Sequence, residues 1–376
     1  MEFRDLKRQY QFFKKDMDIN IQKVIENTNF IQGKQVAELE KILAEYVGVK
    51  NCVSCANGTD ALQLALMAWG IGEGDAVFVP DFTFFSSGEV VSAVNATPVF
   101  VDVEQDTYNI DCNSLEKMIQ KVIGEGKLTP KAVIAVDLFG QPADYAEIRR
   151  IAGQYHMHIL EDAAQGFGGR IGENKAGSFG DIGTTSFFPA KPLGCYGDGG
   201  AIFTDDDAWA ELIRSYRVHG KGSSKYDNVR IGMNSRLDTL QAAVLLTKFP
   251  VFIEKELAWE QDIAAAYTKQ LEGVVKTPVI KDGFYSSWAQ YTIQLSDKAS
   301  RDGLQAHLKE QGIPSAVYYQ KPMHRQAAFE QNHYDDCDYP VTNHLSDVVL
   351  SLPFHPYMEE EEILLVTGEV KKYLRG

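Results

Sequence analysis

Short apolar runs alternate with amphipathic stretches over about residues 50–205, and this alternation constrains the fold more than any other feature of the sequence. The apolar runs have the length of buried strands and are NCVSCA, AVFVP, TPVFVDV, AVIAVDL, MHILED, TTSFF and AIFT. Between several of them, stretches such as TDALQLALMAWG and ADYAEIRRIAGQYH place apolar residues at helical spacing. Strands that alternate with helices form sheets covered on both faces. The sequence therefore predicts an α/β fold with a large, mostly parallel sheet flanked by helices.

The pattern changes near residue 250, which suggests a second unit. The helix-like stretch IEKELAWEQDIAAAYTKQL is followed by the alternating strand WAQYTIQL and then by a polar helix around Arg301 to Gln311. A chain of 376 residues is also long for one compact core. We expect a large α/β domain over residues 1–249 and a smaller α+β domain over residues 250–376, joined by a long helix.

The composition restricts the partners of the protein. The chain has 37 basic and 52 acidic residues, a formal charge of −15, which argues against nucleic acid and anionic membranes. A single pocket can still be positive enough for a small anionic substrate. No run approaches the roughly 18 apolar residues of a membrane span, and the first residues lack the apolar core of a signal peptide. Five cysteines without a secretion signal indicate reduced thiols, so we expect a cytoplasmic location.

Ligands of an α/β sheet bind beyond the carboxyl ends of its strands, so the residues after each strand are the candidates for chemistry. Lys191 follows TTSFF and lies in FFPAKPLGCYGDGGA, among apolar residues, prolines and glycines. It is either an ordinary loop lysine or an amine that a turn points into a cleft. Asp162 ends MHILED, where a carboxylate needs a cation or hydrogen-bond donors. Its partner is either a surface arginine or a protonated ring nitrogen.

Two further strand ends carry residues that would suit a bound ligand. After NCVSCA, Gly58 and Thr59 open a helix whose free N–H groups and dipole suit a phosphate, unless Thr59 only caps the helix. After AVFVP, the segment DFTFFSS holds three aromatic rings, which pack in the core unless one stacks on a flat ligand. A lysine, an acid, a stacking ring and a phosphate-binding turn at strand ends are together what pyridoxal 5′-phosphate requires.

The motifs around these residues resemble those of the DegT/StrS family of nucleotide-sugar aminotransferases, which are pyridoxal-phosphate enzymes of fold type I. The matching segments are ANGTDALQLAL, EDAAQGFG, SFFPAKPLGCYGDGGA and GMNSRLDTLQAA, in the order of the family. The resemblance covers nearly the whole chain, from FRDLK near its start to SLPFHP near its end. It implies an aspartate-aminotransferase-like fold.

The resemblance also implies the cofactor contacts. Lys191 would form the Schiff base with the cofactor, Asp162 would keep the pyridine nitrogen protonated, and Gln165 would reach the phenolic oxygen. The other implied contacts are a ring that stacks on the cofactor and groups that hold its phosphate: Phe84, Gly58, Thr59, Ser186 and, from a neighbouring subunit, Asn234. Because Asn234 would act across an interface, the resemblance implies a homodimer with shared active sites.

Within the family, SFFPAKPLGCYGDGGAIFT and NVRIGMNSRLDTLQAA are most similar to aminotransferases that act at C3 of UDP-2-acetamido-2-deoxy-3-oxo-D-glucuronate. The similarity implies amino transfer from L-glutamate to that UDP-sugar or a related UDP-3-keto sugar, for surface glycans such as lipopolysaccharide O-antigen. Amination at C4 of a UDP-4-keto-6-deoxy sugar, or at C3 of a dTDP-linked one, stays open. Candidate substrate contacts are Arg230, Tyr319 and His324, and Arg230 has the alternative of a surface ion pair.

Other classes of function fit fewer residues. A sugar dehydratase is disfavoured because related dehydratases carry histidine in place of Lys191. A non-catalytic regulator has no basic DNA-binding helix to support it. Cys52 and Cys55 form a C-x-x-C, which is either a redox pair or part of a buried strand; we favour the strand because no second such motif and no histidine lies nearby.

Overall fold

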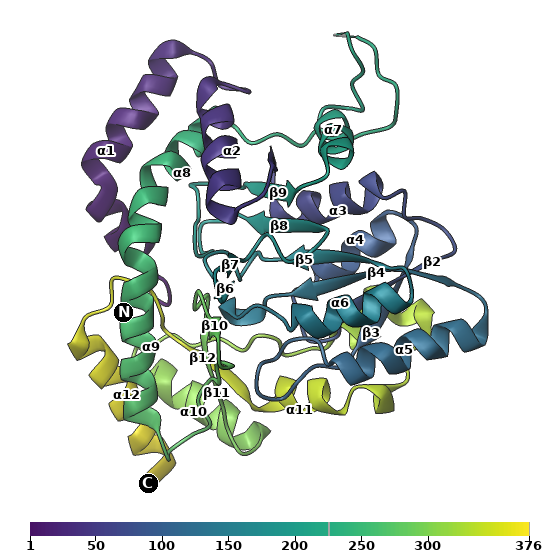
Figure 1. Cartoon of the computed structure of the whole chain (residues 1–376). Coiled ribbons are helices and arrows are strands. Elements are labelled where there is room, and N and C mark those ends of the chain that lie inside the picture. The colour runs from purple at the N-terminus through teal and green to yellow at the C-terminus, as the bar shows by residue number, and fades with distance from the viewer. Residues whose placement is uncertain (225, 376) are drawn as a thin grey trace.

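The computed structural model describes residues 1–224 and 226–375, and a seven-stranded sheet forms its centre (Figure 1). The strand order is β1-β9-β8-β5-β4-β2-β3, and only β9 runs antiparallel to its neighbours. The strands are β1 (Asn51–Cys55), β2 (Asp75–Pro80), β3 (Thr97–Val101), β4 (Thr129–Val136), β5 (His158–Asp162), β8 (Ile182–Ser186) and β9 (Gly200–Thr204). Each overlaps one of the seven predicted runs, which confirms the α/β prediction.

Helices cover both faces of this sheet, as the near-continuous apolar strands require. On β2, Val77 and Val79 pack in one core, while Ala76 and Phe78 pack in the core on the opposite face. The first face is covered by α3 (Gly58–Ala68), α4 (Ser86–Ala93) and α7 (Asp207–Tyr216). The second is covered by α5 (Cys112–Glu125) and α6 (Tyr145–Gln154), and further along by α1 (Leu6–Asn27), α2 (Lys34–Val47) and α8 (Thr239–Val251).

A long helical run connects the large sheet to the C-terminal part. Helix α8 passes through a π-helical turn, Phe252–Glu256, directly into α9 (Leu257–Leu271). The predicted domain boundary at residues 249 and 250 lies inside this run. The division into two domains therefore remains a prediction, because the helix has no break there that would mark it.

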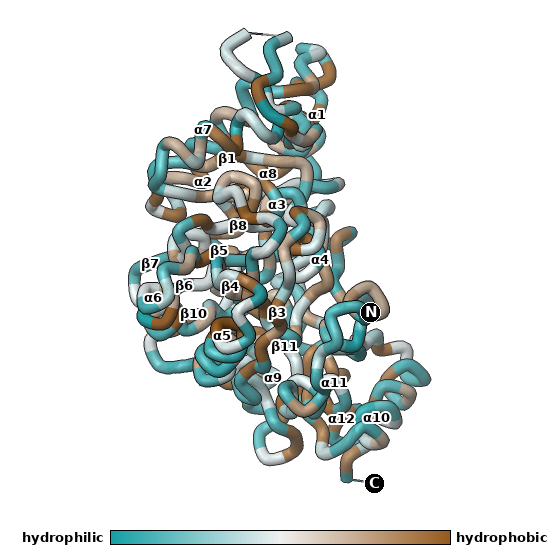
Figure 2. The backbone as a smooth tube through the Cα atoms, turned by 90° about the vertical axis from the view of Figure 1, so that its right-hand side faces the viewer, coloured by the Kyte–Doolittle hydropathy of each residue, from teal (hydrophilic) through white to brown (hydrophobic). Residues whose placement is uncertain are grey.

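The C-terminal part has a core of its own, packed around a two-stranded antiparallel sheet. Its elements are β11 (Tyr291–Gln294), β12 (Val349–Leu352), α10 (Lys298–Glu310), α11 (Pro340–Val348) and α12 (Glu360–Arg375). The side view shows α10, α11 and α12 at one end of the molecule and α1 and α7 at the other (Figure 2). A small three-stranded sheet lies beside the large one and consists of β6 (Arg170–Ile171), β7 (Asn174–Lys175) and β10 (Phe284–Tyr285). Short helical turns span Leu138–Gly140, Met323–Arg325, Ala327–Asn332 and Asp336–Asp338.

The first residues of the chain lie against this C-terminal part. The N–H of Phe354 donates to the carbonyl of Phe3 at 3.0 Å, and Arg8 pairs with Glu362 at 2.8 Å. The N-terminal segment is therefore held in place by residues from the far end of the sequence. In the described part of the chain, none of the helices has the length and apolarity needed to cross a membrane.

Asp102, just after β3, ties the large sheet to α11. Its buried carboxylate accepts hydrogen bonds from the N–H of Val341 at 2.9 Å and from the N–H and hydroxyl of Thr342, both at 2.8 Å. These N–H groups belong to the first turn of α11, where a helix cannot satisfy its own donors. Asp102 thus acts as a helix cap supplied from a distant strand.

We expect Asp102→Ala to lower the free energy of unfolding by about 1–3 kcal/mol, because it leaves buried donors without an acceptor. Urea unfolding followed by circular dichroism measures the change. Asp18→Ala, which removes an exposed ion pair with Lys14, serves as the control and should change it by less than about 0.5 kcal/mol. Equal effects of the two substitutions would contradict the assigned role of Asp102.

Candidate active site

A cavity of about 730 Å³ opens where several strands of the large sheet end. Its walls come from the segments that follow β1, β2, β5 and β8 and from residues 318–326 of the C-terminal part. Eight of the eleven predicted site residues line it: Gly58, Thr59, Phe84, Asp162, Gln165, Ser186, Lys191 and Tyr319. Arg230, Asn234 and His324 do not line it. The structure thus gathers residues that are as much as 261 positions apart in the sequence.

Asp162 ends β5 and faces the cavity from a buried position. Its carboxylate accepts a hydrogen bond from the Ser87 hydroxyl at 2.9 Å and one from the N–H of Ala164 at 3.2 Å. Burial raises the pKa of Asp162, while the Ser87 hydrogen bond and the positive charge of Lys191 oppose the rise. Among the described residues no arginine pairs with Asp162, so the surface-arginine interpretation does not apply. A cation bound in the cavity would favour its ionised form.

Lys191 lies in the turn after β8, half-buried at the same cavity. Its N–H donates to the carbonyl of Phe188 at 2.8 Å, which closes the turn. Burial lowers the pKa of its amine, the charge of Asp162 acts against this, and Arg4 adds to the lowering. A lowered pKa increases the share of the amine that is neutral, and a neutral amine can act as a nucleophile or a base.

Two cations that do not line the cavity contact backbone carbonyls of this turn. Arg4 approaches the carbonyl of Lys191 at 3.4 Å and Glu260 at 3.5 Å. The ammonium of Lys248 on α8, almost fully buried, donates to the carbonyl of Gly194. Burial lowers the pKa of Lys248 to about 8, with the charge of Glu256 acting in the opposite direction. Sequence reasoning missed Arg4 and Lys248, since no local signal links them to a turn so distant in the sequence.

The start of α3 provides a cradle for an anionic group. Asn57 is the N-cap of this helix, because its side chain accepts from the N–H of Asp60 at 2.8 Å. Thr59 is therefore not the cap, and its N–H and that of Gly58 belong to the first turn, which has no intrahelical acceptors for them. A Cβ at Gly58 would lie only 2.7 Å from the Cβ of Ser186, so glycine lets the helix start approach β8. Backbone N–H groups and the Ser186 hydroxyl thus meet at one point.

Gln165 and Tyr319 connect the two sides of the cavity. The Gln165 side chain accepts from the N–H of Phe139 at 2.8 Å and donates to the Tyr319 hydroxyl at 3.0 Å. Phe84 lies near Tyr319, with ring centroids 6.5 Å apart, and 55% of its surface is exposed. An aromatic ring so exposed on a cavity wall leaves a face for a flat ligand. The ring, the buried acid, the lysine and the anion cradle together fit pyridoxal phosphate.

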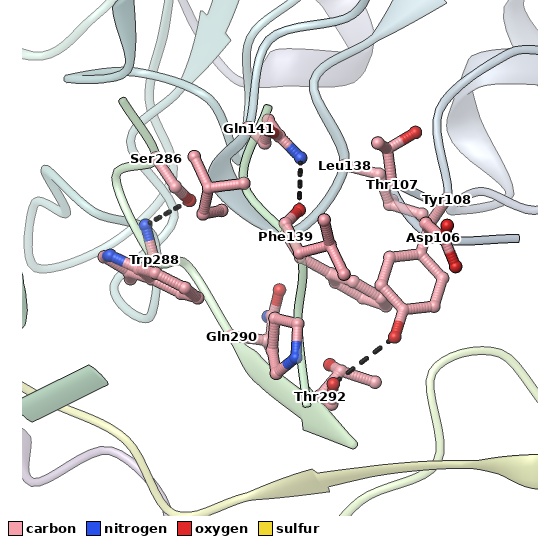
Figure 3. Close-up of a pocket in the computed structure, with 13 residues that line it drawn as sticks. Asp106, Thr107, Tyr108, Leu138, Phe139, Gln141, Ser286, Trp288, Gln290 and Thr292 are labelled. Carbon is pink, nitrogen blue, oxygen red and sulfur yellow. Dashed lines mark hydrogen bonds between the residues drawn. The ribbon is translucent and has the colours of Figure 1, made fainter. Parts of the chain in front are cut away.

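A much smaller hollow of about 20 Å³ adjoins this site, between the turn after β4 and the segment that leads into β11 (Figure 3). It has room for about one water molecule. Gln290 lines both hollows, and Tyr108 donates to the carbonyl of Thr292 across the smaller one at 3.3 Å. This hollow is too small for a substrate. It lies within the packing around Phe139, whose N–H donates to Gln165.

Arg230 and Asn234 lie in the loop between α7 and α8, part of which projects from the body of the protein (Figure 1). Arg230 donates to the Ser215 hydroxyl at 2.6 Å and lies over the ring of Tyr216, with 5.7 Å between guanidinium and ring centroid. Asn234 is exposed and accepts from Arg236. His219 is exposed on the same loop. Within one chain, these residues contact neither Lys191 nor the cavity.

His324 is buried behind the cavity wall. Its two ring nitrogens face Asp81 at 2.6 Å and Asp336 at 2.9 Å, and its backbone N–H donates to Asp81 at 2.7 Å. Asp81 directly follows β2, so this ion pair joins the segment that carries Phe84 to the one that carries Tyr319. The sequence placed His324 near the substrate, whereas the structure makes it an anchor of the wall.

The C-x-x-C motif is part of β1, as the strand interpretation expects. Cys52 packs in the core on one face of the sheet and Cys55 in the core on the other, because residues three apart on a strand point in opposite directions. Burial raises the pKa of both thiols, that of Cys55 to about 12. The redox interpretation is therefore wrong.

Comparisons with known proteins agree with this geometry. A model of the DegT/DnrJ/EryC1/StrS aminotransferase family matches residues 12–371. The chain is 44% identical over 369 residues to a UDP-2-acetamido-2-deoxy-3-oxo-D-glucuronate aminotransferase of Pseudomonas aeruginosa, covering 97% of this chain and 98% of that protein. It is 39% identical over 379 residues to a UDP-N-acetyl-3-dehydro-α-D-glucosamine 3-aminotransferase of Acidithiobacillus ferrooxidans, covering 99% and 97%.

A solved structure is similar over its full length. The crystal structure of a DegT DnrJ EryC1 StrS aminotransferase from Brucella abortus matches with a TM-score of 0.97 and 48% sequence identity, covering 100% of both chains. The two chains therefore share the same overall fold.

The buried histidine gives a pH-dependent prediction. Burial lowers the pKa of His324, but hydrogen bonds and charge from Asp81 and Asp336 outweigh it, so its pKa lies above the usual value of 6.5. A histidine of this kind stabilises the fold fully below the pKa of the unfolded chain, and the contribution is lost as the pH rises through the folded value. We expect His324→Asn to lower the unfolding free energy by about 3 kcal/mol near about pH 6 and by less near about pH 9.

Urea unfolding at the two pH values tests this expectation. His219→Asn is the matched control, because it removes an exposed histidine outside the network. It should have little effect at either pH. A loss for His324→Asn that is the same at both pH values would contradict a charged His324 between the two carboxylates.

Proposed function

The chain belongs to the DegT/DnrJ/EryC1/StrS aminotransferase family, and from this premise we propose that it moves an amino group from L-glutamate to C3 of a UDP-linked 3-keto sugar. The first choice of acceptor is UDP-2-acetamido-2-deoxy-3-oxo-D-glucuronate. Pyridoxal 5′-phosphate is the cofactor of aminotransferases of this family, and the names of two relatives specify amination of a nucleotide sugar. The choice of C3 is supported by two relatives, at 44% and 39% identity, whose names both specify a 3-keto sugar.

One observation carries the proposal: Lys191 and Asp162 face the same cavity, and each affects the pKa of the other. The bound cofactor supplies a protonated ring that stabilises negative charge on a substrate carbon. The carboxylate of Asp162, which accepts a hydrogen bond from the Ser87 hydroxyl, would keep that ring nitrogen protonated. Lys191 would hold the cofactor covalently through Nζ.

The remaining cavity residues bind and orient. The N–H groups of Gly58 and Thr59 and the hydroxyl of Ser186 would hold the cofactor phosphate, and Phe84 would cover one face of its ring. Gln165, which is held by the N–H of Phe139 and donates to the Tyr319 hydroxyl, would donate to the phenolic oxygen. Because the fold already holds these groups, they would orient the cofactor before any substrate arrives.

We assign proton transfer to the Lys191 amine. Nζ would take up the proton that the donor carbon loses and would later return a proton to the carbon that receives the amino group. Its lowered pKa supports this role, since a base must be neutral before it accepts a proton. With the keto sugar, the same group would act in the reverse direction.

We infer that the active unit is a homodimer. The loop with Arg230 and Asn234 also carries Val229 and Ile231, whose side chains are 54% and 91% exposed. Apolar side chains so exposed favour contact with another protein surface. In a dimer, Asn234 would reach the cofactor phosphate of the partner and Arg230 its substrate. The five cysteines are all free, which supports a cytoplasmic location.

The proposal places the enzyme in surface-glycan synthesis, such as that of lipopolysaccharide O-antigen. The alternatives are C4 amination of a UDP-4-keto-6-deoxy sugar and C3 amination of a dTDP-3-keto-6-deoxy sugar. Both would use the same cofactor residues, because the differences lie only in the sugar and the base.

Borohydride treatment of the holoenzyme should fix the cofactor on the peptide that contains Lys191, as mass spectrometry would show. We expect Lys191→Ala to lose amino transfer by at least about a thousandfold, because it removes both the covalent link and the base. Lys309→Ala, an exposed lysine of α10, is the control and should label and react as the wild type does. Turnover by Lys191→Ala near the wild-type rate would refute the mechanism.

A panel of keto-sugar nucleotides with L-glutamate tests the substrate. The amino-sugar product is detected by mass, and we expect it from UDP-3-keto sugars, with the uronate preferred. Activity on dTDP-linked or 4-keto sugars, together with none on any UDP-3-keto sugar, would replace the first choice by one of the alternatives.

A further inference from the structure

Four charged side chains line the cavity within the described part of the chain: Asp162, Lys191, Asp198 and Lys321. The first two are used by the cofactor chemistry. Asp198 is negative and would repel an anionic substrate. Lys321 is thus the one lining cation that the cofactor leaves free, and it has no role in the chemistry described above.

The backbone around Lys321 is fixed. Its carbonyl accepts from the side-chain amide of Gln326 at 3.0 Å. Two residues further, the N–H of Met323 donates to the carbonyl of Asp81 at 3.0 Å, and the next N–H, of His324, donates to the Asp81 carboxylate. The segment that carries Lys321 is therefore tied to the end of β2, and the lysine has a defined starting point on the cavity wall.

The side chain of Lys321 is exposed, and among the described residues no carboxylate lies within 4.0 Å of its ammonium. The nearby acids have other partners: Asp336 pairs with Arg325 and His324, and Asp338 pairs with Lys117 and Lys121. The ammonium is free for an external anion, while acids close to it in the sequence are engaged elsewhere.

The substrate needs such a cation. A nucleoside diphosphate sugar carries negative charge on its diphosphate, and a uronate adds a carboxylate. The protein itself has a formal charge of −15, so a local positive group is required to offset the repulsion. We propose that Lys321 binds the anionic part of the nucleotide sugar. Its partner oxygens belong to the diphosphate or to the sugar carboxylate, which share this acceptor chemistry. The inference rests on the function proposed above.

The position along the wall supports the assignment. Tyr318, Tyr319, Gln320 and Lys321 follow one another along the cavity, with the Tyr319 hydroxyl against Gln165 at the cofactor end and Lys321 exposed at the solvent side. A sugar whose reacting carbon lies beside Tyr319 would extend its charged groups toward Lys321. Lysine reaches anionic oxygens as a flexible point charge, so it tolerates several sugar shapes.

Binding of three non-reacting ligands to the holoenzyme tests the proposal: UDP, UDP-N-acetylglucosamine and its C6 uronate. Calorimetry gives the dissociation constant of each for the wild type, for Lys321→Met and for Lys309→Met, the control with an exposed lysine on α10. We expect Lys321→Met to weaken binding about three- to tenfold, which is typical for loss of one exposed charged contact. The loss should shrink at high salt, because salt screens the interaction.

The three ligands separate the two sources of charge. If all three lose affinity alike, Lys321 binds the diphosphate; if only the uronate does, it binds the carboxylate. Equal affinities for the wild type and Lys321→Met, with the wild type binding normally, would overturn this inference and leave the proposed function intact. A wild type that binds none of the three would overturn both. The unfolding midpoint of Lys321→Met should match that of the control, which shows that the fold is unchanged.

Discussion

The parallel pairing of β5 with β8 is the constraint on which the site depends. The register places Asp162 beside Thr184, so both strands end at the same edge of the sheet, and the turn after β8 brings Lys191 to the acid that ends β5. Burying a single charged acid or amine in a cleft is unfavourable because the group loses its hydration. When both are buried side by side, the charge of each counteracts the effect of burial on the pKa of the other. A shift of this register by one residue would turn Asp162 to the opposite face.

Contacts between distant parts of the chain hold this arrangement. Arg4, from the first residues, approaches the carbonyl of Lys191, and Asp81 binds a histidine 243 positions later. The walls of the cavity are therefore joined by groups outside the cavity itself. The first residues of the chain, which contain no catalytic group, thus help to hold the turn of Lys191.

Much of this architecture is predictable from the sequence, because it depends on local patterns. Each of the seven predicted apolar runs corresponds to a strand, and most of the cavity residues are predictable from their positions after these strands. The missed residues share a different property. Ser87 contacts Asp162, 75 positions away, and Arg4 contacts the backbone of Lys191, 187 positions away. Contacts between residues so distant in the sequence cannot be predicted from local residue spacing. His324 is the opposite case. Its position in the sequence, five residues after Tyr319, suggests a substrate contact, but the folded structure shows that both of its ring nitrogens already pair with carboxylates.

The helical run from Thr239 to Leu271 joins two cores. Residues of α8 pack in a core on one face of the large sheet, and residues of α9 pack in the core of the C-terminal part. Lys248 lies on α8, four residues before the π-helical turn, and its ammonium donates to the carbonyl of Gly194 in the loop of Lys191. One uninterrupted stretch of chain therefore contacts both the C-terminal core and the loop that carries the reactive amine.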